Sequence, residues 1–276
     1  MQREPQSEGE AYVLGTEPEE LRRLIFQHRV WVNETFDLWK MAEISSGQTL
    51  LDLGCGPGFT TVDLASLVGP SGKVIAADKS LNFIEHLRQQ RELHALENIE
   101  LHCTDFDHLS LPEKSLDGVF ARWVLCWLKN PEEVIKQVAA ALRPGAFFAL
   151  LDYFNWGVIS LVPEGSALHR LKAASLEIWR EEGCDINIGQ RIPQMFQRNG
   201  LQVESIEPIA RIARPGSMTW EWIGSFLRIW GPKLVGHGLL SEEEEEELRR
   251  AWQRHETDPA AFCVAPIMVN IVGRKV

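Results

Sequence analysis

Positive charge is scarce in this sequence. The 276 residues include 28 Lys and Arg against 39 Asp and Glu, which gives a net charge of −11. A domain that binds nucleic acid needs a basic surface to release the counterions of the phosphates. We therefore expect no nucleic-acid partner.

Long apolar runs and paired cysteines are also missing. No segment holds the ~18 consecutive apolar residues that a membrane span needs, and residues 1–10 are polar and acidic, unlike a signal peptide. We expect no membrane insertion, and a cytoplasmic protein. The cysteines form no C-x-x-C pair, which predicts reduced thiols, no zinc site and no other metal site. They are Cys55, Cys103, Cys126, Cys184 and Cys263.

Tyrosine is rare as well, with two residues beside ten tryptophans. Tryptophan carries a large apolar surface and one hydrogen-bond donor. The excess therefore indicates either a tightly packed core or a pocket with aromatic walls. The hydrophobic fraction of 45% is sufficient to build a globular core.

Two hydrophobic periods divide the chain. Apolar residues at three- and four-residue steps predict one long amphipathic helix from Pro18 to Ala42. From Gln48 onward, short apolar runs alternate with helical segments, which is typical of a parallel sheet with crossover helices. We expect strands at Thr49–Leu53, Lys73–Ala77, Ile99–Cys103, Leu116–Ala121 and Ala146–Leu151. Asn130 is expected to cap the helix that Pro131 begins.

The regular alternation ends after Asp152. Helices are expected at 166–182, 190–198, 218–235 and 242–255, and strands at 201–212 and 262–272. The glutamates that follow Ser241 suit the first turn of a solvated helix, because acids stabilise the positive end of a helix dipole.

A glycine motif lies between the first predicted strand and the next helix. It is Asp52-Leu53-Gly54-Cys55-Gly56-Pro57-Gly58. Such a turn lets the backbone approach a ligand closely. Phe59 occupies the position of the third glycine of the dinucleotide fingerprint G-x-G-x-x-G, which weighs against a pyrophosphate-binding turn. Asp78 ends the second strand, where an acid can bind the hydroxyls of a ribose.

Together with Cys103-Thr104-Asp105-Phe106 and Leu142-Arg143-Pro144-Gly145, this motif resembles the class I S-adenosylmethionine-dependent methyltransferases, over about Gln48 to Leu151. The small-molecule type is the more similar, including ubiquinone- and menaquinone-biosynthesis-type methyltransferases. The resemblance implies S-adenosylmethionine as cofactor and S-adenosylhomocysteine as its product.

The resemblance also implies a fold class. This is α/β, a doubly wound, Rossmann-like, seven-stranded and mostly parallel sheet with a final antiparallel strand and a helical cap. We expect an N-terminal cap helix region at 1–47, a cofactor-binding core at 48–152 and a helical insert at 153–188. A core helix and sixth strand follow at 189–214, a helical lid insert at 215–259 and the last strand at 260–276.

In the family, the glycine motif holds the methionine and ribose parts of the cofactor, which implies this role for Gly54, Gly56 and Gly58. Asp78 is implied as the ribose ligand and Asp105 as the partner of the adenine amino group. The other cofactor candidates are Asp52, Lys79, Phe106 and Arg122. Asp52 either supports the turn or binds the cofactor, and Phe106 either stacks near adenine or belongs to the core. Arg122 either contacts cofactor or substrate, or is a solvated loop charge.

Aromatic residues near the strand ends are candidates for the acceptor pocket. Trp123 and Trp127 follow the fourth strand, and they either line the pocket or pack in the core. The other candidates are Tyr12, Trp31, Tyr153 and Trp156. His28 lies on the apolar stripe of the first helix, where a hydrogen-bonded core histidine is the default and a general base the alternative.

The function expected from these observations is methyl transfer to a small, largely apolar or aromatic molecule. We expect an in-line displacement driven mainly by positioning. The alternatives are a non-catalytic cofactor sensor or partner-binding scaffold, and a nicotinamide oxidoreductase. The sequence leaves open the identity of the acceptor, the methylated atom, the use of a general base, and whether the protein is a monomer or a homodimer.

Overall fold

The computed structural model describes residues 18–163 and 166–276. Its main sheet has seven strands, and all neighbours pair in parallel except β10, which runs antiparallel to both strands beside it. This confirms the expected fold class. In spatial order the strands are β3 (Ile99–Cys103), β2 (Lys73–Asp78), β1 (Thr49–Leu53), β4 (Leu116–Arg122), β5 (Leu142–Asn155), β10 (Ile267–Lys275) and β7 (Leu201–Ile209).

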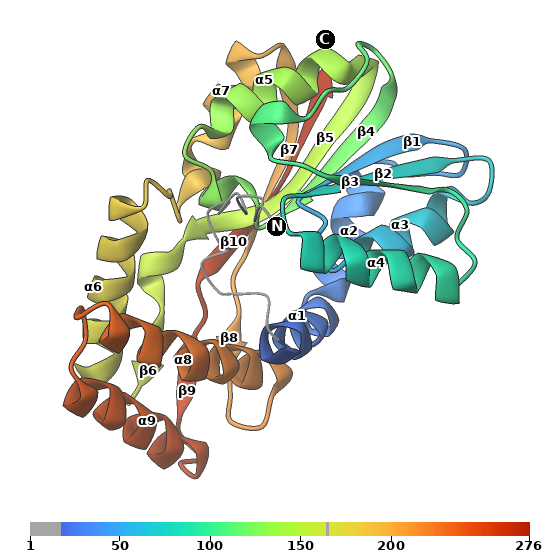
Figure 1. Cartoon of the computed structure of the whole chain (residues 1–276). Coiled ribbons are helices and arrows are strands. Elements are labelled where there is room, and N and C mark those ends of the chain that lie inside the picture. The colour runs from blue at the N-terminus through green and yellow to red at the C-terminus, as the bar shows by residue number, and fades with distance from the viewer. Residues whose placement is uncertain (1–17, 164–165) are drawn as a thin grey trace, which may run out of the picture.

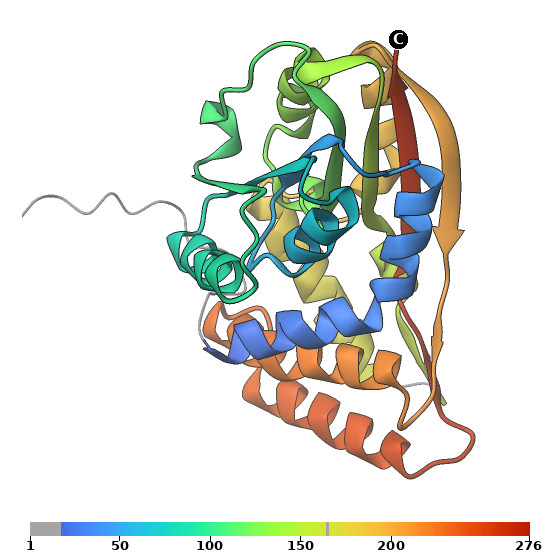
Figure 2. The same ribbon diagram turned by 90° about the vertical axis from the view of Figure 1, so that its right-hand side faces the viewer.

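Helices cover both faces of this sheet (Figures 1 and 2). One face carries α2 (Val32–Met41), α3 (Phe59–Val68) and α4 (Leu81–Leu93), and the other carries α5 (Pro131–Ala141) and α7 (Ile192–Arg198). The central strands are therefore buried on both sides, which explains their continuous apolar runs.

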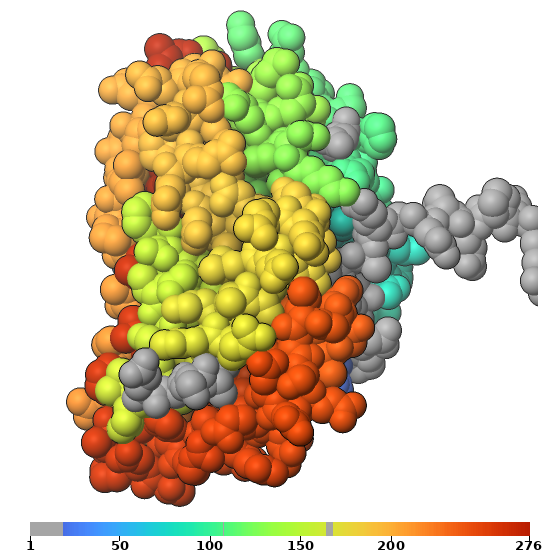
Figure 3. Space-filling model, turned by 90° about the vertical axis from the view of Figure 1, so that its left-hand side faces the viewer, coloured from blue at the N-terminus to red at the C-terminus, as the bar shows by residue number. Residues whose placement is uncertain are grey.

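A cap lies beyond the carboxyl ends of the parallel strands (Figure 1). It contains α1 (Pro18–Val30), α6 (Ser166–Glu181), α8 (Met218–Gly236) and α9 (Glu242–Glu256), which pack against one another. A second small sheet, with the order β6 (Ser160–Val162), β9 (Phe262–Val264) and β8 (Ile212–Ala213), lies beside these helices. On the face shown in Figure 3, α6 and the 236–256 segment form a continuous surface.

The prediction of one helix from Pro18 to Ala42 is wrong. The chain bends at Trp31, and α2 starts at Val32. The two halves pack in different directions, because α1 contacts α8 of the cap whereas α2 contacts β5 and β10 of the sheet. Both halves keep the helical period, so the bend leaves no mark in the hydrophobic pattern.

Two predicted strands are each divided between the two sheets. The strand expected at 201–212 separates into β7 and β8, and the one expected at 262–272 separates into β9 and β10. Pro266 stands between β9 and β10 and has no N–H to donate to a ladder. Asn130 also departs from expectation, since its side chain makes no capping hydrogen bond to α5.

Tryptophan serves both expected purposes. Five of the ten are among the largest fully buried side chains, namely Trp31, Trp39, Trp179, Trp220 and Trp230. Others line cavities in the cap, as described below. No helix in the described ranges 18–163 and 166–276 combines the length and hydropathy that a membrane crossing requires.

Candidate cofactor and acceptor site

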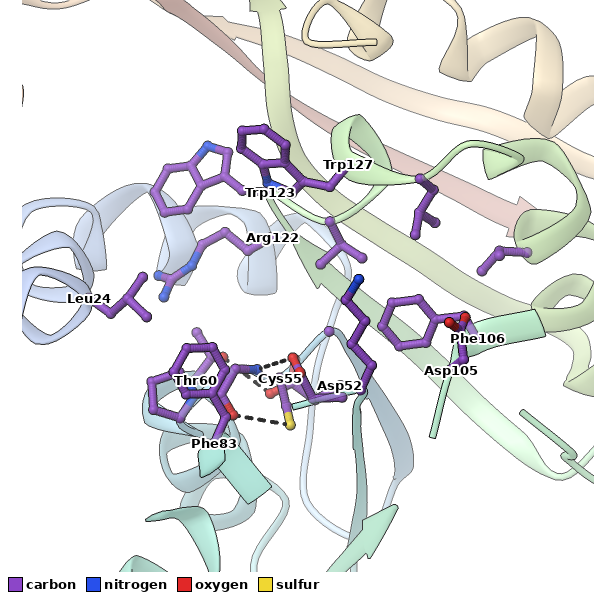
Figure 4. A pocket seen from close by; sticks show the side chains of 18 of the residues that line it. Leu24, Asp52, Cys55, Thr60, Phe83, Asp105, Phe106, Arg122, Trp123 and Trp127 are labelled. Atoms are coloured by element: carbon purple, nitrogen blue, oxygen red, sulfur yellow. Dashed lines mark hydrogen bonds between the residues drawn. The ribbon is translucent and has the colours of Figure 1, made fainter. Parts of the chain in front are cut away.

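A cavity of about 280 Å³ lies at the carboxyl ends of β1, β2 and β4, with α1 on its cap side. Figure 4 shows Trp123 and Trp127 on one side of it, Thr60 and Phe83 on the opposite side, and Asp105 with Phe106 on a third. Eight of the nine predicted cofactor residues line this cavity. They are Asp52, Gly54, Gly56, Asp78, Lys79, Asp105, Phe106 and Arg122.

Two positions of the glycine turn have no room for a Cβ atom. Gly54 has φ +69°, and a Cβ there would lie 2.3 Å from Cγ2 of Val124. Gly58 also has a positive φ, but its missing Cβ makes room for Leu87 of α4, and Gly58 is not among the residues that line the cavity. The third glycine of the motif therefore serves helix packing, and Gly54 and Gly56 form the cavity wall.

Asp78 fixes this turn from the end of β2. Its Oδ2 accepts a hydrogen bond from the backbone N–H of Gly56 at 2.9 Å, and its Oδ1 accepts one from the N–H of Ser80 at 2.9 Å. Burial raises the pKa of Asp78, while these two N–H groups act in the opposite direction. Each carboxylate oxygen has further lone pairs, so this geometry leaves acceptor capacity for two ligand hydroxyls.

Asp52 is buried at the end of β1. Its Oδ2 accepts hydrogen bonds from the hydroxyls of Thr60 at 3.1 Å and Thr61 at 2.6 Å, both in the first turn of α3. Burial raises the pKa of Asp52 to about 6, although the threonine bonds and Arg122 oppose the shift. The site thus holds a carboxylate whose ionisation is costly until a cation enters the cavity.

Arg122 extends from the end of β4 toward α1 and α2. It donates to Oγ1 of Thr35 at 3.0 Å and to Nδ1 of His28 at 3.3 Å. Because arginine is always a donor, the proton of neutral His28 must be on Nε2, which lies 3.2 Å from Oδ2 of Asp63. Burial lowers the pKa of Arg122 to about 10. His28 therefore links Asp63 to Arg122 and is not itself among the lining residues.

A second, smaller cavity of about 40 Å³ adjoins the first on the cap side. Gln27, Trp123 and Trp127 line both cavities. The smaller cavity is bounded by α1, α6 and α8 and by the loop after β5, and its aromatic walls define what we call the aromatic chamber. Its aromatic residues are Trp123, Trp127, Tyr153, Trp156, Trp179, Trp222 and Phe226.

Trp123 carries an unusual backbone. Its φ is +53°, a strained conformation that bulky residues rarely adopt. Such strained residues cluster at functional sites. Its N–H donates to the carbonyl of Leu151 at 2.9 Å, and a short 3₁₀ turn at Leu125–Trp127 follows. This turn brings Trp123 and Trp127 to the same cavity, so both line the pocket, which is one of the two expected alternatives.

Of the predicted acceptor residues, Tyr153 and Trp156 lie in the aromatic chamber with Trp123 and Trp127. Trp31 is fully buried behind this wall, with ring centroids 5.5 Å from Trp123 and 5.1 Å from Trp222. Tyr12 lies outside the described residues.

Several lining residues were not predicted. Gln27, Leu24 and Phe83 reach the cavity from helices α1 and α4, and Leu128, Lys129 and Asn130 reach it from the loop before α5. Leu24 and Gln27 did carry a sequence signal, because their segment is similar to the N-terminal cap that folds over the cofactor pocket in small-molecule methyltransferases. Phe83 had none, and Asn130 was marked only by its place beside the Trp127 turn. Phe59, which argued against a dinucleotide turn, also lines the cavity.

The charge pattern of the larger cavity fits S-adenosylmethionine. Three carboxylates line it, from Asp52, Asp78 and Asp105, and suit an ammonium, a sulfonium and ribose hydroxyls. The guanidinium of Arg122 suits a carboxylate on the same ligand. Among the described residues no cluster of His, Cys, Asp or Glu has the arrangement of a metal site.

Comparison with known proteins agrees with this geometry. Residues 51–150 match the family model described as a methyltransferase domain. The ubiquinone/menaquinone biosynthesis C-methyltransferase of Hahella chejuensis is 30% identical over 127 residues, which is 46% of this chain and 50% of that protein. An arsenite methyltransferase of Halobacterium salinarum is 32% identical over 111 residues, covering 40% of this chain and 28% of that protein. The matches thus span half or less of these curated relatives.

Solved structures share the fold over more of the chain. A SAM-dependent methyltransferase from Aquifex aeolicus has a TM-score of 0.53 and 20% identity, covering 72% of this chain and 93% of that one. The Haemonchus contortus phosphoethanolamine N-methyltransferase 2, bound to S-adenosylhomocysteine, has a TM-score of 0.57 and 17% identity, covering 88% and 52%. The [4+2]-cyclase SpnF has a TM-score of 0.54 and 14% identity, covering 88% and 80%. Residues 51–150 therefore match the methyltransferase-domain family, and the chain has the fold of these solved structures.

Proposed function

We propose that this protein transfers a methyl group from S-adenosylmethionine to a small, largely apolar or aromatic acceptor. The observation that supports it best is the junction of two cavities. One is lined by the glycine turn and three carboxylates, the other by seven aromatic residues, and they share Gln27, Trp123 and Trp127. A methyl donor in the larger cavity and an acceptor on the side of the smaller one can therefore meet at the junction, beside the two indole rings.

When bound, S-adenosylmethionine supplies a methyl group already activated on a positively charged sulfur. The chain's own task is then to orient both reactants and exclude water. Positioning of this kind is worth roughly 7–11 kcal/mol of the barrier. Asp78 and the glycine turn hold the ribose side, and Asp52 and Arg122 face the charged end of the cofactor. The cap helices keep the acceptor side dry.

The direct test is release of S-adenosylhomocysteine. Purified protein is incubated with S-adenosylmethionine and a panel of small aromatic and apolar acceptors, and the product is quantified by mass spectrometry. The proposal predicts S-adenosylhomocysteine formation that requires both the acceptor and an intact Asp78. Tight cofactor binding without turnover across a broad panel would instead favour a cofactor sensor.

A nicotinamide oxidoreductase makes a different prediction. A thermal-shift comparison of S-adenosylmethionine, S-adenosylhomocysteine and NAD distinguishes the two classes. We expect stabilisation by the first two and none by NAD, because Phe59 stands at the cavity wall where a pyrophosphate turn needs a glycine. The cyclase SpnF shares the fold, so turnover must be measured directly.

A further inference from the structure

Gln27 lies where the two cavities meet, and its side-chain amide has only one possible orientation. Its Oε1 accepts from Nη1 of Arg23 at 2.9 Å and from Nε1 of Trp222 at 2.9 Å. Both partners are obligate donors, so the oxygen of the amide must face them. The two N–H donors of Nε2 therefore point away from these partners.

Those donors meet no acceptor among the described residues. Gln27 is only 9% exposed. Its Nε2 atom has no partner in the described chain but is not fully enclosed, so it retains contact with open space. Since Gln27 lines both cavities, that space is the junction between them. A ligand acceptor placed at the junction would pair with this donor.

The support behind Gln27 is rigid. Arg23 also donates from Nε and Nη2 to the two carboxylate oxygens of Glu20, each at 2.7 Å. Glu20 is 2% exposed and Arg23 7%. The ion pair fixes the guanidinium, the guanidinium fixes Gln27, and Trp222 of α8 fixes it from the opposite side.

The aromatic chamber has no carboxylate that could pair with a cationic ligand. No Asp or Glu lines it, and its one charged residue, Arg23, is paired with Glu20. The indole N–H groups of two of its residues, Trp123 and Trp179, are buried and have no acceptor within the described chain. Those two N–H groups are fully enclosed and face no open space, so Nε2 of Gln27 is the donor that a carbonyl, phenolic or enolic oxygen would meet at the junction.

We propose that Gln27 is the residue that positions the acceptor, by donating a hydrogen bond to an oxygen on a planar apolar molecule held where the aromatic chamber opens into the larger cavity. This inference rests on the proposed methyltransferase function. It favours oxygen-bearing aromatic or conjugated molecules over cationic amines as the acceptor, because a cation has no hydrogen bond to accept from Gln27.

The test uses a matched pair of probes on full-length protein saturated with S-adenosylhomocysteine. Acetophenone carries a carbonyl, and α-methylstyrene has the same shape with a methylene in its place. Their dissociation constants are measured by ligand-observed NMR. We expect acetophenone to bind about ten-fold more tightly, the value of one net hydrogen bond.

Gln27→Met keeps the length of the side chain and removes the donors, so it should bring the two probes to equal affinity. If Gln27→Met does not fold, Gln27→Glu keeps an acceptor for Arg23 and Trp222 while its ionised form offers no donor. Equal affinities in the wild type, discrimination that survives in the variant, or tighter binding of benzyltrimethylammonium than of acetophenone would overturn the inference. Failure of S-adenosylhomocysteine to bind at all would instead remove the proposed function.

Discussion

At the scale of single residues, Asp52 combines a cost in stability with a benefit in binding. Its pKa is about 6 in the folded protein against 3.8 ordinarily, so the unfolded chain ionises first as the pH rises. Well below pH 3.8 both states are protonated and the penalty vanishes, and well above pH 6 both are ionised and it is complete at roughly 3 kcal/mol. The free energy of unfolding contributed by this group therefore falls between these pH values.

Asp52→Asn should consequently raise the free energy of unfolding at pH 7 by about 1–3 kcal/mol, because an amide oxygen can still accept from Thr60 and Thr61. The same change should weaken binding of S-adenosylmethionine about ten-fold or more, since the anion facing the cationic cofactor is lost. Urea unfolding and calorimetric titration measure the two effects.

Asp152 provides a matched control. It is also buried with a pKa near 6, but it binds the N–H groups of Cys126 and Tyr153 and is not among the residues that line either cavity. Asp152→Asn should change cofactor affinity by less than about three-fold, because Asp152 lies outside both cavities. Its gain in stability should be smaller than that of Asp52→Asn, since both Asp152 oxygens accept a backbone N–H and the amide can replace only one of them. Equal losses of affinity in both variants would show that Asp52 does not act on the ligand directly.

The variant His28→Ala distinguishes two roles for this histidine, a general base and a positioning residue. Its ring nitrogens face Arg122 and Asp63, so His28→Ala should lower the free energy of unfolding by about 1–3 kcal/mol and kcat by less than about ten-fold. Urea unfolding and a pH–rate profile check this. A loss of kcat above about a hundred-fold with unchanged stability and a lost ionisation in the profile would instead establish the general base.

The sequence is a good guide to residues that directly follow strands. Asp52, Asp78 and Asp105 each follow or end a parallel strand, and strand ends meet at one edge of such a sheet. Gln27 and Phe83 reach the same cavity from helices, so their position depends on how those helices pack. Local periodicity marks them only as members of a helix face.

At the scale of elements, Arg211 joins three parts of the chain. It pairs with Glu34 of α2, donates to the carbonyl of Val30 at 3.0 Å and to Oγ1 of Thr219 in α8 at 3.3 Å, and lies 4.2 Å from the centroid of the Trp31 ring. These contacts lie at the bend between α1 and α2. They explain how the chain tolerates a change of direction that no glycine or proline marks.

Arg211→Met should lower the free energy of unfolding by about 2–4 kcal/mol, because Glu34 and the Val30 carbonyl lose their partner in a half-buried place. Hydrogen exchange should be fastest to increase in α1 and α8. Arg274→Met is the control, since its ion pairs with Glu43 and Glu204 lie at the surface and are worth about 1 kcal/mol or less. Similar losses in both variants would contradict a special role for Arg211 in holding the cap.

At the scale of the whole molecule, the doubly wound sheet was predictable because its strands alternate with helices in regular units. The helices of the cap were also expected, but its small sheet was not. Its small sheet pairs segments from three distant regions, β6, β8 and β9, and each is two or three residues long. Strands this short carry no periodicity of their own, so only the assembled fold determines their pairing.

The cap also explains the acidic, tryptophan-rich composition. The acids concentrate partly in the first turn of α9, where Ser241 and Glu244 form a capping box. Tryptophans occupy the interior, where Trp179 stacks on Trp230 at 5.5 Å and Trp220 on Trp252 at 4.0 Å. An aromatic interior of this kind would keep water out of the aromatic chamber, which the proposed methyl transfer requires.

We propose that S-adenosylmethionine binds in the cavity at the strand ends, held by Asp78 and the glycine turn. Isothermal titration calorimetry of S-adenosylmethionine into the wild type and Asp78→Ala tests it most directly. We predict one site per chain in the wild type and a loss of roughly ten- to a hundred-fold in Asp78→Ala, the equivalent of about 1.5–3 kcal/mol for charge-assisted hydrogen bonds. No binding by the wild type, or the same affinity in a correctly folded Asp78→Ala, would contradict the account.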